Sequence, residues 1–487
     1  MSLATLHCIC LDRIYGYLKK GSWKFCTTNP FSKLPSHDVN RLAQITLLND
    51  SEDPPKFGDF SPILTSGRLT QLDLRPFYPD AEYDFIVKAI QKGHIISLQN
   101  RASKAEKVIF HLVRNAISWN PYLEELHLGI DPGFDVIRKC QNLRILRMYC
   151  SFSSLLDKNV PIDLSALSSL RNLEVLYIPD MDIETIANVL ETCPKLISIG
   201  LNDSLDSLEE IAQRRQKNSL SGFDVGGHFQ LRRCAWGDRS LLDPHERCLN
   251  KSRLFCRMRF AVALCPLVQE LIFYVHAKNA MGPLKFLKHL TFLSIDFSTC
   301  KEDFLRNFVV LLLDLGKQLK HLSIIGLHRY PVDIICFCCP HLQSLEIYGY
   351  PFVKDSTEDP GNLPLKRLRL QSLYASDDKE SLLYLLSNCK LLEELFLCEV
   401  GSFDDVLLSE IFQRNPFTEL KVSCIEYCSL TREGYKMFIE KAASIETVII
   451  WDLENCLYDV NRLVNEPNLR YLKNVDIRMK EFFNIEF

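Results

Sequence analysis

The sequence lacks the short motifs that mark the common enzyme classes. It contains no glycine-rich phosphate loop, no G-x-S-x-G nucleophile turn and no H-E-x-x-H zinc motif. Its one double glycine, Gly226-Gly227, is interpreted as a turn. We therefore expect a protein that is not an enzyme, with no catalytic residues and no cofactor.

Long hydrophobic runs are also lacking. The longest, around Phe308–Leu313, is far too short to cross a bilayer, which takes about 20 residues. The amino terminus has no basic region, and Asp12 and Arg13 interrupt its apolar stretch, so no secretory signal is expected. With 47% hydrophobic and 24% charged residues, the composition is that of an ordinary folded chain. These features predict a cytoplasmic or nuclear protein without a membrane partner.

Paired C-x-x-C motifs at zinc-ligand spacing are absent, although the chain holds 19 cysteines. Cys336, Cys338 and Cys339 are close in sequence, but His341 is their one plausible neighbouring ligand, so no metal site is expected. Several cysteines end a predicted helix just before an apolar strand, as in TCPKLISI and NCKLLEEL. A reduced cysteine is a small hydrophobe that fits a tight corner, which explains much of the count without disulfides.

What the sequence does contain is a repeat of the form apolar-x-x-apolar-x-apolar. Its copies begin at Leu123, Leu143, Leu173, Leu196, Val268, Leu290, Leu319, Leu342, Leu365, Leu392, Phe417, Ile445 and Leu472. From Val268 onward the copies start 22 to 29 residues apart. That spacing is typical of leucine-rich repeats, which have roughly 20–29 residues each.

The repeat predicts an α/β fold. In each copy the last two apolar side chains alternate onto one face of a short strand. Between strands the apolar residues have helical spacing, as in SLLYLLSNC. Because one strand–helix unit cannot cover its own apolar face, neighbouring units must stack. We therefore predict that residues 49–487 form a leucine-rich-repeat solenoid, a curved parallel sheet with outer helices.

Two stretches interrupt the pattern. Between Leu74 and Leu123 at most one weak unit is expected, around Ile95–Leu98. The gap between Leu201 and Val268 is too long for two regular repeats, so we expect one repeat at Leu231/Cys234/Trp236 and an irregular insertion around residues 203–260.

That irregular region is basic in a chain whose net charge is -4. Residues 213–260 contain eleven Lys and Arg and four Asp and Glu, which gives this segment a net charge of +7. One interpretation is a docking surface for an acidic partner, represented by Arg232, Arg233, Arg257 and Arg259. The other is a solvated loop and helix face. Nucleic acid is a disfavoured partner, because the chain is acidic overall and carries no recognised nucleic-acid module.

Residues 1–48 precede the repeats and are predicted to be helical. Leu6, Cys10 and Ile14 are spaced i, i+4, i+8, as one stripe of a helix, and Leu11 and Leu18 are expected to widen that apolar face. Such a helix can insert into a partner's groove. It can equally cap the open end of the repeat array, an end that every such array has.

The stripe carries a resemblance to a known motif. Residues 5–14, TLHCICLDRI, resemble the elongin-binding BC box, Ser/Thr-Leu-x-x-x-Cys-x-x-x-aliphatic, and all four specified positions match. Residues 34–42, LPSHDVNRL, resemble the cullin-2 box, apolar-Pro-x-x-apolar-x-x-x-apolar. The initial Leu-Pro and Leu42 fit that box, whereas Asp38 occupies an apolar position and Val39 stands one place late.

A BC box, a cullin box and leucine-rich repeats, in this order, make the chain similar to the Zyg-eleven and Zer-one type substrate receptors of cullin-2 ubiquitin ligases. The armadillo-like domain that follows the repeats in those receptors is expected to be absent, since the repeats continue to the end of this chain. The resemblance implies elongin B/C contacts at Leu6, Cys10 and Ile14. It implies cullin-2 contacts at Leu34, Pro35, Val39 and Leu42. The repeats would hold a protein substrate, which the sequence does not identify, and raise its effective concentration.

Two alternatives remain open. LHCICLDRIYGYL also resembles the middle of an F-box, which implies Skp1 and cullin-1 in place of elongin and cullin-2. The usual Leu-Pro start of an F-box is missing here. The second alternative is a leucine-rich-repeat scaffold or inhibitor without a ligase role. Its contacts would come from residues between the strand leucines, such as His127 and Phe396.

Overall fold

The computed structural model describes most of the chain in two compact units. The first comprises residues 1–202 with 229–231, and the second comprises residues 203–228 with 232–487. Within them the described residues are 3–48 without 21, 24, 25 and 27, then 57–73, 95, 97–100, 107–149, 164–179, 181–218, 227–237, 251–276, 278–298, 305–352, 363–371 and 379–451. No helix in these described ranges is both long and apolar enough to cross a membrane.

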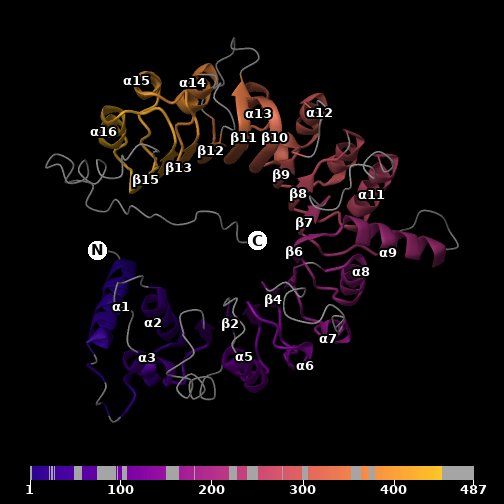
Figure 1. Cartoon of the computed structure of the whole chain (residues 1–487), viewed down its shortest axis with the longest axis vertical. Coiled ribbons are helices and arrows are strands. Elements are labelled where there is room, and N and C mark those ends of the chain that lie inside the picture. The colour runs from indigo at the N-terminus through magenta and orange to yellow at the C-terminus, as the bar shows by residue number, and fades with distance from the viewer. Residues whose placement is uncertain are drawn as a thin grey trace. The chain divides into compact units, whose positions relative to one another are not determined.

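The first unit starts with helices and continues as strand–helix repeats (Figure 1). Its N-terminal helical segment consists of α1 (Leu3–Lys19), η1 (Pro30–Lys33), α2 (Ser36–Leu48) and α3 (Phe57–Leu64). The strands are β1 (Gln71–Asp73), β2 (Ser97–Asn100), β3 (Glu125–Leu128), β4 (Ile145–Met148), β5 (Val175–Tyr177) and β6 (Ser198–Asp203), the last residue of which begins the second unit. The helices between them are α5 (Lys107–Trp119), α6 (Phe134–Ile137), α7 (Leu164–Ser168) and α8 (Ile183–Thr192).

The second unit repeats the same alternation with longer strands. Its strands are β7 (Arg233–Trp236), β8 (Glu270–Tyr274), β9 (Phe292–Asp296), β10 (His321–Pro331), β11 (Ser344–Phe352), β12 (Arg367–Gln371), β13 (Glu394–Cys398), β14 (Val422–Glu426) and β15 (Thr447–Trp451). Its helices are α9 (Leu205–Asn218), α11 (Lys251–Leu264), η3 (Lys278–Phe286), α12 (Leu305–Leu315), η4 (Gly316–Gln318), α13 (Val332–Cys338), α14 (Lys379–Asn388), α15 (Asp405–Arg414) and α16 (Arg432–Lys441).

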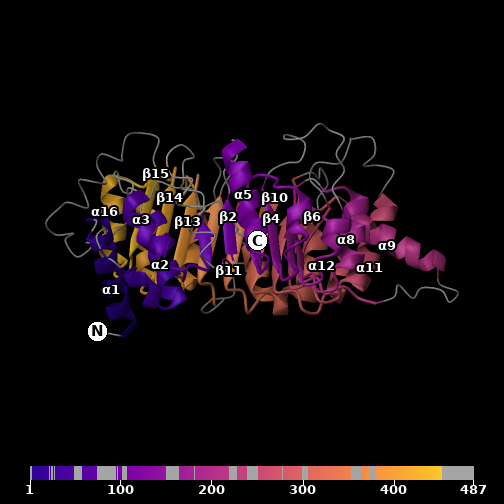
Figure 2. The ribbon, with the colours of Figure 1, turned by 90° about the horizontal axis from the view of Figure 1, so that it is seen from below.

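Strands that follow one another in sequence pair in parallel, in both units. Figure 2 shows β13, β14 and β15 side by side. In each unit the helices lie on one face of a curved sheet, and we name the opposite face the inner face (Figure 1). The prediction of an α/β fold with a curved parallel sheet and outer helices is therefore confirmed.

The repeated leucines form the core between sheet and helices. Leu395 and Leu397 of β13 are 0% and 1% exposed, whereas Phe396 between them is half-buried on the inner face. The repeat predicted at Leu231/Cys234/Trp236 is confirmed as β7, with all three side chains buried. The weak unit predicted at Ile95–Leu98 coincides with β2, and Ile95 and Leu98 are buried. The repeat predicted at Leu472 lies outside the described residues.

A recurring pair of hydrogen bonds fixes the register at the start of most described strands from β4 onward. The carbonyl of Lys366 accepts the amides of Glu393 (2.7 Å) and Glu394 (3.0 Å) from the next repeat. The carbonyl of Lys421 likewise accepts those of Glu446 (2.7 Å) and Thr447 (3.0 Å). Because one carbonyl holds two consecutive amides, a slip of one residue would break both bonds.

Cysteine or asparagine fills the corner between helix and strand in several repeats. The corner cysteines Cys140, Cys193, Cys265, Cys339 and Cys389 are at most 2% exposed. Asn415 occupies the same kind of corner, and its Nδ2 donates to the carbonyls of Leu386 (2.7 Å) and Cys389 (3.1 Å). The prediction that these cysteines pack as small apolar residues is confirmed.

Asn40 of α2 caps the first sheet at β1. Its side chain is 9% exposed, and its Oδ1 accepts the amides of Thr70 (3.0 Å) and Gln71 (3.2 Å). Its Nδ2 donates to Oγ1 of Thr70 (2.7 Å). Since β1 pairs with β2 through its other edge, Asn40 satisfies amides that would otherwise be left without a partner.

We expect Asn40→Ala to destabilise this end of the sheet by about 0.5–1.5 kcal/mol, because it removes the hydrogen bonds to two partly buried amides. Urea unfolding measures the loss, and hydrogen exchange should accelerate at Thr70 and Gln71. Gln44→Ala is the matched control on the same helix, since exposed Gln44 makes only a 3.3 Å contact with the Gln71 side chain. Equal effects of the two substitutions would contradict the capping role.

The cysteines should differ sharply in reactivity. Cys10, Cys26 and Cys256 are exposed. Burial raises the pKa of Cys265 and Cys389 well above the ordinary range, so their reactive thiolates are suppressed. In the native chain at neutral pH, iodoacetamide should alkylate the first three and spare the last two, as read by mass spectrometry. Alkylation of all five at similar rates, before unfolding, would refute this description of the corners.

Candidate functional site

Helix α1 has a buried face and an exposed face. Leu11 and Leu18 are each 3% exposed, and the helix packs on α2 and α3. Ile9 is 40% and Tyr17 52% exposed, and Cys10 is exposed as well. The exposed face of α1 therefore presents apolar side chains around a small thiol, the surface we consider for partner binding.

The sequence prediction for this helix needs one correction. Leu11 and Leu18 do not widen the stripe of Cys10, because helical geometry of about 100° per residue turns them toward α2 and α3. Ile14 is half-buried at the border between the two faces. The backbone of Leu6 belongs to α1, and its side chain lies outside the described part of the structure.

An aromatic series joins α1 to the second motif. The Tyr17 and Trp23 rings are 6.0 Å apart, and the Trp23 and Phe31 rings are 5.2 Å apart, both edge-on. Phe31 is buried in η1, and its carbonyl accepts the amide of Leu34 at 3.2 Å. Leu34 is half-buried and Pro35 exposed. Thus the structure brings the Leu-Pro of the second motif close to the C-terminal end of α1.

Sequence reasoning missed these aromatic residues. Tyr17, Trp23 and Phe31 lie outside both motifs, and their spacing follows neither a helical nor a strand period. Only the turn after α1 brings them into contact. The sequence signal that could have indicated this turn is Trp23 after the helix, followed by Asn29-Pro30. In the structure Asn29 caps η1, because its Oδ1 accepts the amide of Phe31 at 2.9 Å.

Two of the predicted cullin contacts are core residues. Val39 and Leu42 are both 0% exposed, on the face of α2 that also carries buried Ala43. Their spacing of three residues turns both side chains inward. A direct contact with a cullin is incompatible with this burial, so the accessible part of the second motif is Leu34-Pro35.

The predicted basic patch is not a single surface. Arg232 and Arg233 are at the start of β7, whereas Arg257 and Arg259 are on α11. Arg257 is engaged internally, with Nη1 2.7 Å from Oδ1 of Asp206 and Nε 2.7 Å from Oε2 of Glu209.

Arg233 is also paired, with Nε 2.9 Å from Oε2 of Glu270. The excess of positive charge in this segment is real, but two of the four predicted patch residues, Arg233 and Arg257, are paired with carboxylates of the same chain. Arg232 and Arg259 are exposed. Arg239 and Arg247, which contribute to the same local charge, lie outside the described residues.

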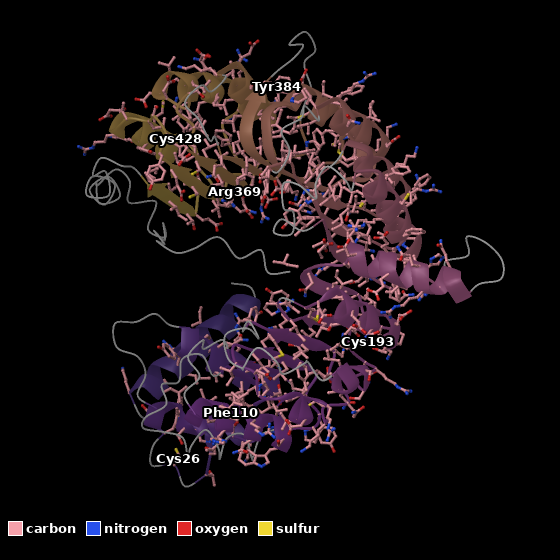
Figure 3. All side chains as sticks on the ribbon, turned by 45° about the vertical axis from the view of Figure 1, so that its right-hand side comes forward. Cys26, Phe110, Cys193, Arg369, Tyr384 and Cys428 are labelled. Atoms are coloured by element: carbon pink, nitrogen blue, oxygen red, sulfur yellow. The ribbon has the colours of Figure 1, made fainter. Side chains whose placement is uncertain are left out.

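The second unit carries paired charges directly before its strands and aromatic rings on its inner face. Glu393 lies 3.0 Å from Nζ of both Lys366 and Lys421, and hydrogen bonds from these lysines, Lys421 first, lower its pKa. Arg369 lies over the Tyr348 ring at 5.4 Å. Figure 3 shows Arg369 on the inner face and Tyr384 on the helical side. Such a surface of polar and aromatic groups can bind a protein.

Comparisons with known proteins give only distant likenesses. No family model matches the chain, and no curated protein matches it. Among solved structures, the chain is similar to a leucine-rich-repeat protein of Leptospira interrogans, with 13% identity, a TM-score of 0.34, and coverage of 80% of this chain and 91% of that chain. It is also similar to the complex of Rad7 and Elc1 in yeast, with 13% identity, a TM-score of 0.24, and coverage of 51% and 83%. Likeness at this level assigns no family to the chain.

Proposed function

We propose that this chain is the substrate-recognition subunit of a cullin-RING ubiquitin ligase, acting in the cytoplasm or nucleus. In this proposal the exposed face of α1 binds elongin B/C, and the repeats hold a protein substrate. The chain itself performs no chemistry. The observation that carries the proposal is the exposure of Cys10, at BC-box spacing, on a helix whose opposite face is anchored by Leu11 and Leu18.

Helix α1 is available for a partner because α2, and not α1, closes the sheet. Closing the sheet at β1 falls to α2, through Asn40. Helix α1 packs outside α2 and α3, so its outer face is not needed to satisfy the sheet. A helix that presents apolar side chains around a small residue fits an apolar groove, because the small residue lets the two backbones approach closely.

The second contact would be made by the cullin through Leu34 and Pro35. Both are accessible at least in part, and the aromatic series Tyr17–Trp23–Phe31 holds them beside the end of α1. Adaptor and cullin would therefore meet adjacent surfaces of one helical segment. The repeats then contribute by positioning, since a tethered substrate has a high effective concentration near the ligase's catalytic partners.

Binding assays with purified full-length chain test the proposal. We expect elongin B/C to be retained by the wild type and lost in Leu6→Ser/Cys10→Asp, because an unpaired charge buried in an apolar groove is costly. Arg13→Gln is the matched control, exposed on the same helix at an unspecified motif position, and should bind normally. Retention of Skp1 instead would assign an F-box-type adaptor. Binding of neither would leave α1 as part of the cap and refute the ligase role.

Protection of a thiol offers a second readout without mutation. Cys10 and Cys256 are both exposed in the free chain. When elongin B/C is added, alkylation of Cys10 should slow at least about tenfold, while that of Cys256 on α11 should not change. Equal alkylation of Cys10 with and without elongin B/C would exclude this face of α1 as the binding site.

A further inference from the structure

Arg147 on β4 stands out among the charged residues of the first unit. It lies between Leu146 and Met148, both 0% exposed, so its own side chain is on the inner face. It is half-buried, and its Nε is shielded from solvent and has no hydrogen-bond partner. A guanidinium has five donors and stays charged at any physiological pH. Shielding its Nε–H donor from water without a hydrogen-bond acceptor is unfavourable.

Arg144, at the start of the same strand, has the opposite environment. Its Nε donates to Oε1 of Glu174 at 3.0 Å, and its Nη2 lies 2.8 Å from Oε2. The guanidinium is also 3.8 Å from Glu124. These contacts lower the pKa of Glu174, chiefly through its hydrogen bond with Arg144.

Two other arginines at strand starts form ion pairs, as Arg144 does and, within the described part of the chain, Arg147 does not. Arg233 pairs with Glu270, and Arg367 pairs with Glu394. On β3 the one carboxylate is Glu125, which pairs in register with Ile145, two residues before Arg147, and no ion pair within the described residues joins Glu125 to Arg147. Arg144, Arg233 and Arg367 thus hold carboxylates, whereas no ion pair among the described residues involves the half-buried Arg147.

Aromatic side chains form the surroundings of Arg147. In the sheet register it stands between His127 of β3 and Tyr177 of β5. The rings of Tyr149 and Tyr177 are 5.9 Å apart, and Tyr149 is 37% exposed.

Gly200 on β6 has φ +66°, and a Cβ there would come within 2.3 Å of the Tyr177 ring. Glycine at this position therefore leaves the space that the ring occupies. The result is an aromatic surface beside a cation that has no counter-ion in the described part of the chain.

We propose that Arg147 is the recognition residue for an acidic side chain of a protein partner that binds the inner face of the first unit. A carboxylate of Asp or Glu would receive two parallel N–H···O bonds from the guanidinium. Apolar residues next to it in the partner would lie on Tyr149 and Tyr177. An acidic partner is favoured because its carboxylate would neutralise the guanidinium of Arg147. A carboxylate is favoured over a phosphate, because a phosphate dianion is usually held by a cluster of cations and Arg144 is already occupied.

This inference deepens the proposed function, on which it rests for its assignment of the repeats to a protein substrate. It also names the chemistry the substrate would present, an acidic residue flanked by apolar ones. Elongin binding does not involve Arg147, so the two proposals can fail separately.

Selection from a random dodecapeptide library on phage tests the inference. The full-length wild type, Arg147→Gln and Arg144→Gln serve as parallel baits. We expect wild type and Arg144→Gln to enrich peptides with Asp or Glu at one fixed position beside apolar residues. Arg147→Gln should lose that enrichment and bind the selected peptides about 10- to 100-fold more weakly, as for a lost charged hydrogen bond. The same peptides with Gln or Asn at the fixed position should bind the wild type as weakly.

Three outcomes would overturn the inference. They are the absence of any enriched acidic position, its persistence with Arg147→Gln, and its loss with Arg144→Gln to the same degree. A phosphoserine version that binds more tightly than the Glu version, again through Arg147, would replace the carboxylate by a phosphate.

Melting temperatures distinguish a loss of binding from a loss of folding in the Arg147 variants. Arg147→Met retains the aliphatic packing and removes the unpaired charge, so its melting temperature should equal or exceed that of the wild type. A marked decrease would show that Arg147 acts within the fold, which contradicts a role reserved for a partner. Both Arg147 variants should still bind elongin B/C as the wild type does.

Discussion

The structure depends on the burial of each repeat's strand leucines by the neighbouring repeats. A single strand–helix unit exposes its apolar side chains at both flanks, and its strand leaves a row of amides and carbonyls unpaired. Parallel stacking solves both problems together. Leu395 and Leu397 become fully buried, and the carbonyl at each strand start takes two amides of the next repeat. The same constraint forces something else to close the array where stacking begins.

Asn40 meets that requirement at β1 by satisfying two amides. Because α2 supplies this cap, α1 can be held by a few buried side chains, Leu11 and Leu18 among them, and present its other face outward. The aromatic contacts from Tyr17 through Trp23 to Phe31 then place Leu34-Pro35 beside it. The candidate adaptor surface thus follows from how the repeat array is terminated, and not from an independent domain.

Electrostatics distinguish structural from recognition charges in the repeats. Most charged groups described at the strand starts neutralise one another, as Arg144 does with Glu174 and Arg367 with Glu394. Exposed pairs of this kind contribute little stability, about 0–1 kcal/mol each, but they remove net charge from the surface. Arg257 is a further example, since it links α11 to Asp206 and Glu209. Against this background the lone guanidinium of Arg147 is conspicuous.

The sequence by itself determined the repeat. The spacing of Leu, Ile and Val within LxxLxL forces strands with one buried face, and the corner cysteines are small enough for the turn that follows each helix, so the α/β architecture could be read without coordinates. The irregular unit at Cys234 and Trp236 was predictable for the same reason. The alternation of buried and exposed residues within one strand depends on neighbouring residues, so it can be read from the sequence.

Only the tertiary structure decided which residues of the candidate sites face outward. Leu11 and Leu18 of α1, and Val39 and Leu42 of α2, have the same apolar character whether they meet a partner or the chain's own core. The sequence also could not show that Arg233 and Arg257 have carboxylate partners, because those carboxylates belong to other strands and helices, or that Arg147 has none among the described residues. The physical reason is that burial and ion pairing are relations between segments far apart in the chain. Stacking of the repeats creates those relations, and residue type alone does not encode them.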